Sequence, residues 1–391
     1  MNQLVKKWFV VLIVALVILL TRVLWKNIVW ESKEPLNSEK KQLQEVTRQF
    51  KGQLLKSPPA KNYTIRETLP VLVPIICGVS AKKRKIDESG KKYKVPNIVH
   101  LVRIGDRVPF DAVTYLTLRS MASIQQPEVI YIYYTTTIPT SKFAERAKKE
   151  IPCLQWVKVK DPEYVNGVHL SVPDSRTDIV RFTKLLEHGG IYVDNDVILL
   201  KSLDPLRHYS FVAGREHAES INDGIMLVEK NSYFANKFYH ESYLKALENY
   251  DPNEYFTYAQ DGLYRFYRQN MEPDVHIEEF AFNRPLPFDG YEGFGAAVNS
   301  HYDLSENYVL HIHPRATVGH VPELNYIYTD TEEEVRTRDN IYGAAARIAY
   351  FGSPDLIFKP GEKVYSRAPT IKLKPLPKIE PDNENSSNIT R

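Results

Sequence analysis

The stretch GGIYVDNDVILL, residues 189–200, predicts both the core strand of this chain and the chemistry at its end. It is a hydrophobic run interrupted by two acidic residues, Asp194 and Asp196. In an extended chain residues i and i+2 point the same way, so both carboxylates project from one face of the strand end. Two such carboxylates repel each other unless a cation lies between them. We therefore expect a hard divalent cation, Mg²⁺ or Mn²⁺, whose coordination shell is completed by a phosphorylated ligand.

Outward from this stretch, the apolar pattern alternates between strand and helix. Predicted strands cover residues 95–105, 128–135, 154–160 and 191–193, and predicted helices cover 114–126, 141–150 and 176–188. Gly189 stands at the usual C-cap position of the last helix. This alternation predicts an α/β fold with a mostly parallel sheet covered by helices on both faces. Ligands of such sheets bind beyond the carboxyl ends of the strands.

Composition and missing motifs exclude several classes of protein. The 391 residues are 43% hydrophobic, and 51 basic against 48 acidic side chains leave a net charge of only +3. Nucleic acid is therefore not an expected partner, because phosphate binding needs a concentrated basic face. Neither G-x-G-x-x-G nor G-x-x-x-x-G-K-[ST] occurs, which excludes a dinucleotide fingerprint and a P-loop.

The first residues differ from the rest of the chain. The uncharged run that begins at Trp8 is short for a membrane helix unless Arg22 snorkels, and a cleaved signal peptide is the alternative. The bulky residues 21–30 offer no small-x-small cleavage site, which favours an uncleaved signal anchor. The predicted organisation is a cytoplasmic tail (1–7), a transmembrane helix (8–30), a stem (31–94), a catalytic domain (95–371) and a disordered tail (372–391).

This topology places everything after the anchor in the lumen. Glycan acceptor sequons are present there, at Asn62, Asn385 and Asn388. The two cysteines, Cys77 and Cys153, could form one disulfide in that oxidising compartment.

Asp178 and Arg181 lie three residues apart and share a face near the start of the predicted helix 176–188. A purely structural interpretation of the two residues is a capping interaction of Asp178 with Ser175 and a surface salt bridge of Arg181. Their functional interpretation is a polar pair beside the two aspartates.

Taken together, D-x-x-R, an apolar helix, GG-I-Y-x-D-x-D and a following L-D-P at residues 203–205 resemble the sugar-binding DXD region of glycosyltransferase family 32. The close match covers residues 174–205, with weaker echoes from 96 to about 313. The resemblance implies a GT-A fold, a type of Rossmann-like sheet, and a Golgi enzyme, with the endoplasmic reticulum as the alternative location. It also implies a nucleotide-sugar donor, UDP in preference to GDP, and Mn²⁺ or Mg²⁺ as cofactor.

The resemblance also assigns roles by position. The donor-binding residues would be Asp178, Arg181, Tyr192, Asp194 and Asn222. The metal ligands would be Asp194, Asp196 and a late histidine, for which His311 is preferred to His313. The expected acceptor is a glycan or a glycolipid.

The resemblance further implies transfer of a hexose or N-acetylhexosamine with retention of anomeric configuration. Double displacement would need a carboxylate nucleophile, for which Asp223 and Asp261 are candidates, whereas a front-face mechanism needs none. Two other functions stay open: a non-catalytic membrane-anchored sugar-binding protein, and a phosphatase of the haloacid dehalogenase type that uses Asp194 as nucleophile.

Overall fold

The computed structural model describes residues 65–66, 71–78, 85–106, 109–217, 219–283, 301–313, 332–358 and 370–371, all within the unit Ser57–Arg391. The predicted cytoplasmic tail, signal anchor and C-terminal tail lie outside these residues, as do the three sequons and most of the predicted stem. Within the described ranges, no helix combines the length and the apolar character that a membrane crossing requires.

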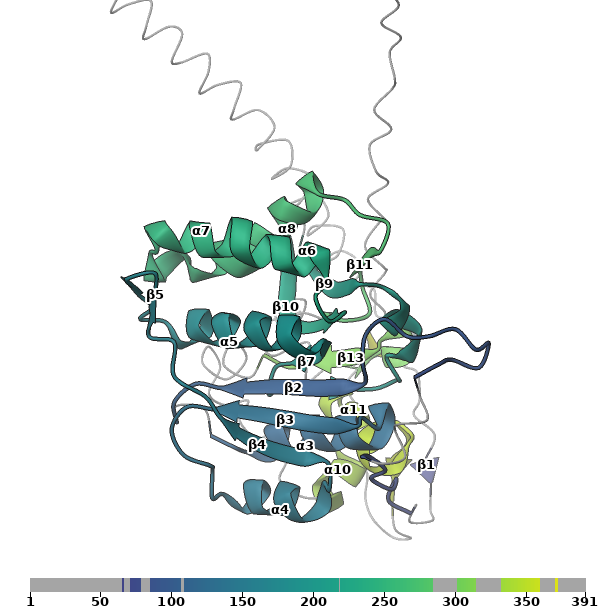
Figure 1. Cartoon of the computed structure of the whole chain (residues 1–391). Helices are drawn as coiled ribbons and strands as arrows, with labels where there is room; N and C mark the ends of the chain where they lie inside the picture. Colours follow the sequence, from purple (N-terminus) through teal and green to yellow (C-terminus); the bar gives the residue numbers. More distant parts are fainter. Residues whose placement is uncertain are drawn as a thin grey trace, which may run out of the picture. The chain divides into compact units, whose positions relative to one another are not determined.

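A seven-stranded sheet forms the centre of the fold (Figure 1). Its strands in spatial order are β11 (Val275–Glu278), β9 (Phe211–His217), β10 (Ser220–Val228), β7 (Gly190–Val193), β2 (Ile98–Arg103), β3 (Val129–Tyr134) and β4 (Leu154–Lys158). β2 pairs in parallel with β3 and β7, β3 with β4, and β9 with β11. Only β10 among these seven runs antiparallel to its neighbours, β7 and β9. The prediction of a mixed, mostly parallel sheet is confirmed.

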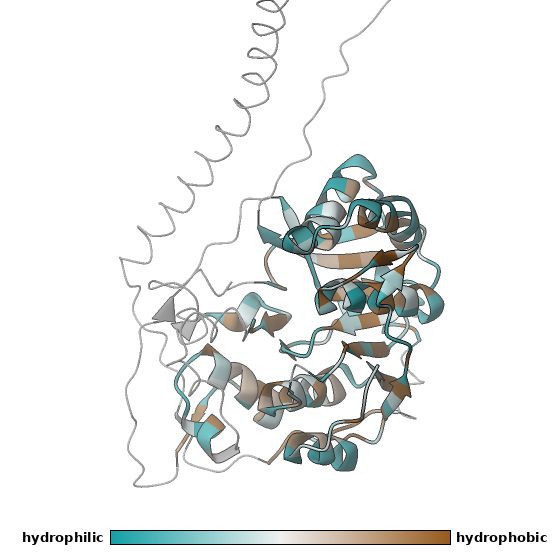
Figure 2. Cartoon of the chain, turned by 90° about the vertical axis from the view of Figure 1, so that its left-hand side faces the viewer, coloured by the Kyte–Doolittle hydropathy of each residue, from teal (hydrophilic) through white to brown (hydrophobic). Residues whose placement is uncertain are grey.

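Helices cover both faces of this sheet. One layer holds α3 (Ala112–Ser120), α4 (Lys142–Glu150), α10 (Glu332–Thr337) and α11 (Ile341–Phe351); the other holds α5 (Pro173–His188), α6 (Tyr233–Lys237), α7 (Leu244–Ala246) and α8 (Tyr255–Gln269). Strand β7 shows how alternation serves both layers: Ile191 and Val193 pack into the core with α3 and α11, whereas Tyr192 packs with α5 and α8. Accordingly, hydrophobic residues concentrate on the strands of the sheet (Figure 2).

The predicted elements are present with shifted ends. Helix α5 begins at Pro173, three residues before the predicted start, because proline suits the first turn of a helix. Ser175 therefore lies inside the helix and is not its N-cap residue. The structural interpretation of Asp178 as a capping partner of Ser175 is wrong. The predicted helix 114–126 is α3 followed by a π-helical turn, Met121–Gln125.

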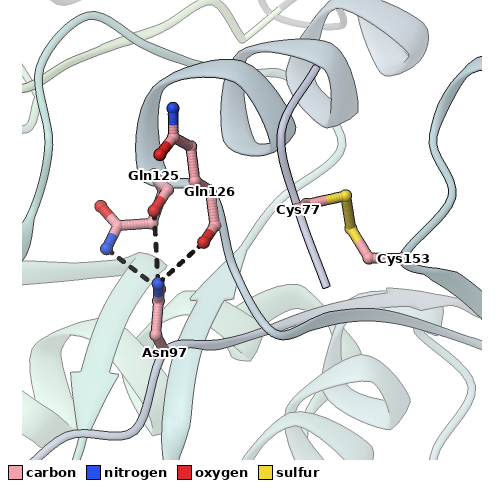
Figure 3. The surroundings of a disulfide bond; sticks show 5 residues. All are labelled: Cys77, Asn97, Gln125, Gln126 and Cys153. Atoms are coloured by element: carbon pink, nitrogen blue, oxygen red, sulfur yellow. Dashed lines mark hydrogen bonds between the residues drawn. A yellow bond between two sulfur atoms is a disulfide. The ribbon is translucent and has the colours of Figure 1, made fainter. Parts of the chain in front are cut away.

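Part of the predicted stem is attached to the sheet domain. The amide of Val73 donates to the carbonyl of Tyr350 in α11, and strand β1 (Ile65–Arg66) pairs with β14 (Leu356–Ile357). Cys77 forms a disulfide with Cys153, just before β4 (Figure 3). Beside it, the side chain of Asn97 donates to the carbonyls at the end of the π-helical turn, which fixes the start of β2.

Two glycines allow α5 to turn directly into β7. Gly189 and Gly190 have φ values of +67° and +127°, in the region that favours glycine. A Cβ atom on Gly190 would lie 2.5 Å from the carbonyl oxygen of Ile98 and 2.7 Å from the ring of His100. The close pairing of β7 with β2, and hence the position of the two aspartates after β7, depends on this missing side chain.

Candidate active site

Asp194, Asn195 and Asp196 form a turn between β7 and strand β8 (Val197–Leu199), where the sequence predicts a continuous strand end. Three hydrogen bonds hold the backbone of this turn. The amide of Asp194 donates to the carbonyl of Gly224, the hydroxyl of Thr117 donates to the carbonyl of Asn195, and the amide of Ile312 donates to the carbonyl of Asp196. The turn is therefore fixed by α3, by β10 and by the end of β13.

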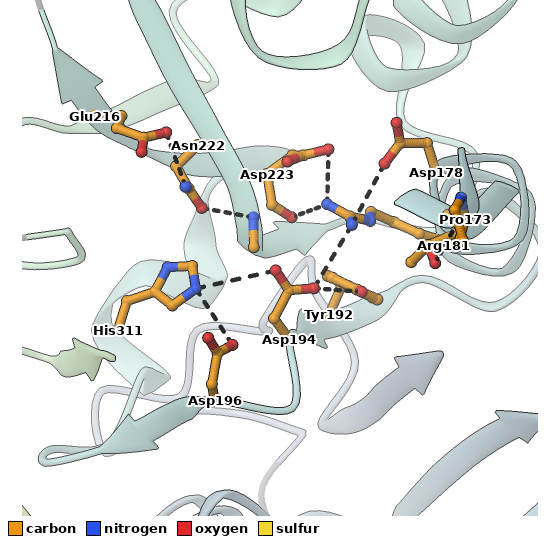
Figure 4. A network of polar contacts seen from close by, with 12 residues as sticks. Pro173, Asp178, Arg181, Tyr192, Asp194, Asp196, Glu216, Asn222, Asp223 and His311 are labelled. Atoms are coloured by element: carbon orange, nitrogen blue, oxygen red, sulfur yellow. Dashed lines mark hydrogen bonds and ion pairs between the residues drawn. The ribbon is translucent and has the colours of Figure 1, made fainter. Parts of the chain in front are cut away.

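Strand β13 (Val309–His311) pairs with β8 and brings His311 to the two aspartates. Its Nε2 lies 3.4 Å from the carboxylate of Asp196 and 4.0 Å from that of Asp194 (Figure 4). The ring of His313 stacks on that of His311 at 3.6 Å, and one ligand atom each from Asp196, His311 and His313 lie within 4.8 Å of one another. His313 reaches this position with φ of +50°, a strained value that is typical of functional sites.

This donor set fits a divalent metal ion. It combines carboxylate oxygens with imidazole nitrogens, and the Nδ1 atom of His311 is buried without a hydrogen-bond partner among the described residues. Carboxylates suit Mg²⁺ and Mn²⁺ alike, whereas imidazole ligands favour a transition metal.

Arg181 is the centre of a buried ionic network (Figure 4). Its guanidinium lies 2.6 Å from the carboxylate of Asp223, 3.4 Å from that of Asp178 and 3.6 Å from that of Asp194. It also stacks on the ring of Tyr192 at 4.3 Å, and the Tyr192 hydroxyl donates to Asp194 at 2.6 Å. Three carboxylates on one cation leave a net negative charge, which is the field that a metal ion needs.

Burial and neighbouring charges shift the pKa values of these groups. Burial raises the pKa of Asp178 well above its ordinary value, and Asp223 adds to the effect. Burial also raises the pKa of Asp194, against the attraction of Arg181. For His311, burial lowers the pKa, but Asp196, Asp194 and Glu216 together outweigh burial, so the net pKa is raised. The cluster thus attracts positive charge, as either a proton or a metal ion.

A bulge in β10 turns the segment 222–224 toward this network. Along β10 the partner in β9 changes from Gly214 opposite Asn222 to Ala213 opposite Met226. The carbonyl of Asp223 accepts from Arg181 at 2.6 Å, and the side chain of Asn222 accepts from the amide of Gly224 and donates to Glu216. The bulge places both the carbonyl and the carboxylate of Asp223 against Arg181.

Most of the charged and polar groups described above line one cavity of about 440 Å³ at the carboxyl ends of the parallel strands. A cavity of this size is typical of small-molecule sites. Its walls are Val102, Arg103, Ile104, Gly105, Pro173, Asp174, Thr177, Asp178, Arg181, Asp194, Asn195, Asp196, Asn222, Asp223, Tyr255, Phe256, Ala259, Gln260, His311 and His313.

Two predicted site residues are absent from these walls. Tyr192 is fully buried and contacts Arg181 and Asp194, so it holds these two cavity residues in position and does not line the cavity itself. Asp261 lies on α8, where the first turns face the cavity through Tyr255, Phe256, Ala259 and Gln260. Successive residues of a helix point about 100° apart around its axis. Asp261 follows Gln260 and is therefore turned away from the cavity.

Some cavity residues escaped the sequence analysis. Residues 102–105 are the last two residues of β2 and the two that follow it, and the rule that ligands bind at the carboxyl ends of strands could have marked them. Tyr243, whose hydroxyl donates to Asp178 at 3.0 Å, carries no local signal, because its role depends on the packing of two helices.

Comparison with known proteins now adds to this geometry. Residues 115–212 match the family model described as a glycosyltransferase sugar-binding region containing a DXD motif. The chain therefore contains this sugar-binding region. The matched residues run from α3 to β9 and include Asp178, Arg181 and both aspartates of the DXD turn, so the resemblance to glycosyltransferase family 32 is confirmed.

Relatives of this glycosyltransferase include two fungal proteins. Glucan organizing enzyme 1 of Cryptococcus neoformans is 23% identical over 274 residues, which cover 65% of this chain and 70% of the relative. Inositol phosphoceramide mannosyltransferase 3 of Schizosaccharomyces pombe is 39% identical over 59 residues, 15% of this chain and 17% of the relative. Among solved structures, the galactosyltransferase LgtC aligns with a TM-score of 0.36 at 15% identity, over 61% of this chain and 98% of that one.

Proposed function

We propose that this glycosyltransferase moves a hexose or N-acetylhexosamine from a nucleotide diphosphate sugar, a UDP-sugar in preference to a GDP-sugar, to a glycan or glycolipid acceptor. The observation that carries the proposal is the meeting of the Asp196 and His311 side chains with the Arg181 network in one cavity. A metal-binding cluster beside a set of sugar-sized polar contacts suits a donor that has a diphosphate at one end and a sugar at the other.

In this proposal Asp194, Asp196 and His311 hold Mn²⁺, with His313 as the alternative histidine or as a further ligand. When bound, the ion supplies Lewis-acid stabilisation of negative charge on the departing nucleotide diphosphate. The match to the DXD region supports a divalent metal, and the imidazoles support Mn²⁺ over Mg²⁺.

In this proposal the side chains of Asp178 and Arg181, which form the sugar side of the cavity, bind and orient the donor sugar. Asp178 receives a hydrogen bond from Tyr243 and faces Arg181, so its remaining acceptor capacity can be used by a sugar hydroxyl. Arg181 keeps three carboxylates in fixed positions. Groups held in place in this way lose no reorganisation energy when the reaction occurs.

The same geometry bears on the retaining mechanism. Of the two candidate nucleophiles only Asp223 lines the cavity, and its carboxylate is held 2.6 Å from Arg181. An ion pair with a guanidinium withdraws negative charge from the carboxylate and makes it a weaker nucleophile. We therefore favour the front-face course, in which the leaving phosphate itself accepts the proton of the acceptor hydroxyl and no carboxylate forms a covalent intermediate.

The proposed location is the Golgi membrane, with a single N-terminal anchor and a lumenal catalytic domain, and the endoplasmic reticulum is the alternative. The mostly apolar segment 8–30, predicted as the anchor, and the sequons at Asn62, Asn385 and Asn388 support a lumenal chain. The disulfide Cys77–Cys153 also suits an oxidising compartment.

The test follows nucleotide release by the full-length chain from a panel of UDP- and GDP-sugars, with Mn²⁺, with Mg²⁺ and with EDTA. We expect metal-dependent release from one donor and its loss in Asp196→Ala. The control is Asp274→Ala, because Asp274 is an exposed aspartate outside the cavity that forms a surface pair with Lys94. Absence of both release and calorimetric binding for every donor would contradict the proposal and favour another function of the site.

A further inference from the structure

Two aromatic side chains stand out among the polar walls of the cavity. Tyr255 and Phe256 are the first two residues of helix α8. Among the described residues that line the cavity, they are the only tyrosine and the only phenylalanine. Their rings lie 3.9 Å apart between centroids at 32°, which makes one joined aromatic surface. Phe256 is 51% exposed, although burial of a phenylalanine is favourable by about 1.5–3 kcal/mol.

The fold itself makes no use of this exposed ring. The core side of α8 is formed by Tyr258, Ala259, Leu263 and Phe266, which pack in the same hydrophobic cluster as β9 and β10. Tyr258 is buried and its hydroxyl accepts from the amide of Asp251, so it anchors the start of the helix. Phe256 has neither role, and it lies on the cavity wall.

Contacts between helices place this aromatic surface on the sugar side of the cavity. The ring of Tyr258 packs against Tyr250 at 5.7 Å, and the Tyr250 hydroxyl accepts from the amide of Val172 at the start of α5. The first turns of α5 then supply Asp174, Thr177 and Asp178 to the cavity wall. Helix α8 thus begins beside the helix that carries Asp178 and Arg181.

We propose that Tyr255 and Phe256 are the acceptor platform, on which a pyranose ring of the acceptor stacks with its C–H face. The inference rests on the proposed function and specifies its acceptor as a ring-form sugar. An aromatic surface recognises the apolar face of a pyranose, while the polar rim of carboxylates and Gln260 offers partners to the hydroxyls. The pair belongs to α8, which supplies none of the proposed metal ligands, so the acceptor subsite can be altered separately from the metal site.

The experiment measures nucleotide release by the full-length chain from its donor, with water as acceptor and then with added methyl α-D-mannopyranoside, methyl β-D-galactopyranoside or methyl β-D-glucopyranoside. Sorbitol serves as the polyol without a ring. We expect at least one pyranoside, and not sorbitol, to accelerate release and to appear as product. In Phe256→Ala the concentration for half-maximal acceleration should rise roughly tenfold, while the KM for the donor stays unchanged.

Three further variants make the test specific. Phe256→Trp should retain the effect of the pyranoside, because it keeps an aromatic face. Phe256→Leu should lose most of it, because it keeps apolar volume without that face. Tyr233→Ala removes an aromatic ring that is 66% exposed and does not line the cavity, and it should behave as the unchanged protein.

Each remaining outcome has a defined meaning. A tenfold rise in donor KM in Phe256→Ala, with the pyranoside response intact, would show that the pair stacks on the donor and would overturn the platform. Donor release that no pyranoside affects in the unchanged protein would also overturn it. Absence of any donor release or binding would instead refute the proposed function itself, so the two failures are distinguishable.

Discussion

Gly224→Ala should push the side chains of the proposed metal cluster apart without removing any of the proposed ligands. A Cβ atom on Gly224 would lie 2.6 Å from the ring of His311, 2.7 Å from the carboxylate of Asp194 and 2.7 Å from the side chain of Asn222. Asn222 belongs to β10 like Gly224 itself, but the backbones of Asp194 and His311 are held in other segments, after β7 and on β13. Each distance would have to lengthen by at least about 0.7–0.8 Å to reach ordinary packing, which begins near 3.4 Å.

The expected magnitude follows from that displacement. Misplacement of catalytic groups by about 1 Å costs on the order of 100-fold in rate, which equals about 2.7 kcal/mol of transition-state stabilisation. We expect kcat/KM for metal-dependent nucleotide release to fall by about this factor. Calorimetric titration of the full-length chain with Mn²⁺ alone should show weaker binding, which is a readout independent of turnover.

The matched control is Gly262→Ala in α8. Its Cβ would lie 3.3 Å from the carbonyl oxygen of Thr257 and at ordinary contact distances, 3.9 and 4.0 Å, from Phe238 and Arg265. Alanine also favours a helix over glycine by about 1 kcal/mol. It should retain activity and stability. A folded Gly224→Ala variant that binds Mn²⁺ and turns over within twofold of the unchanged chain would refute the view that this glycine makes room for the metal cluster.

Three other predictions follow from buried groups outside or around the cluster. Replacement of Arg181 by glutamine leaves its buried carboxylate partners unpaired and should lower the free energy of unfolding by about 3–5 kcal/mol in urea titrations; an unchanged midpoint would contradict the network. Burial lowers the pKa of His100 to about 4 from 6.5, so between these values the unfolded chain binds more protons and stability falls as the pH falls. The unchanged protein should therefore lose about 3 kcal/mol more than His100→Gln between about pH 7.5 and about pH 4, and equal losses would argue against the burial of a neutral ring. Cys77 and Cys153 close a loop across a separation of 76 residues, so Cys77→Ser should cost about 4 kcal/mol in nonreducing urea titrations and nothing further under reducing conditions.

Local sequence predicted the elements that carry the DXD turn. Each of these elements either forms part of the sheet or packs against it, so its buried residues recur at the spacing of a strand or a helix. The apolar pattern of the sequence therefore shows them clearly: β2, α3, β3, α4, β4, α5 and β7. Element ends were less well predicted. Pro173 at the first turn of α5 is a known start signal that the analysis of the residues did not use.

Long-range pairing explains what local sequence could not predict. His311 joins Asp196 because β13 pairs with β8, and nothing near either residue encodes that pairing. The bulge that brings Asp223 to Arg181 depends on a register change against β9. The rotation of α8 about its own axis decides that Gln260 lines the cavity and Asp261 does not. This rotation is set only when the helix packs against the rest of the protein.

The pairing of β8 with β13 has a consequence for the biosynthesis of this enzyme. A ribosome completes Asp194 and Asp196 well before His311, because all of β9 to β11 and α6 to α8 are made in between. A chain that stops before β13 therefore contains the whole DXD turn but no imidazole beside it. The metal cluster is complete only when these distant segments have met, so its capacity to bind Mn²⁺ would distinguish finished molecules from nascent or truncated ones.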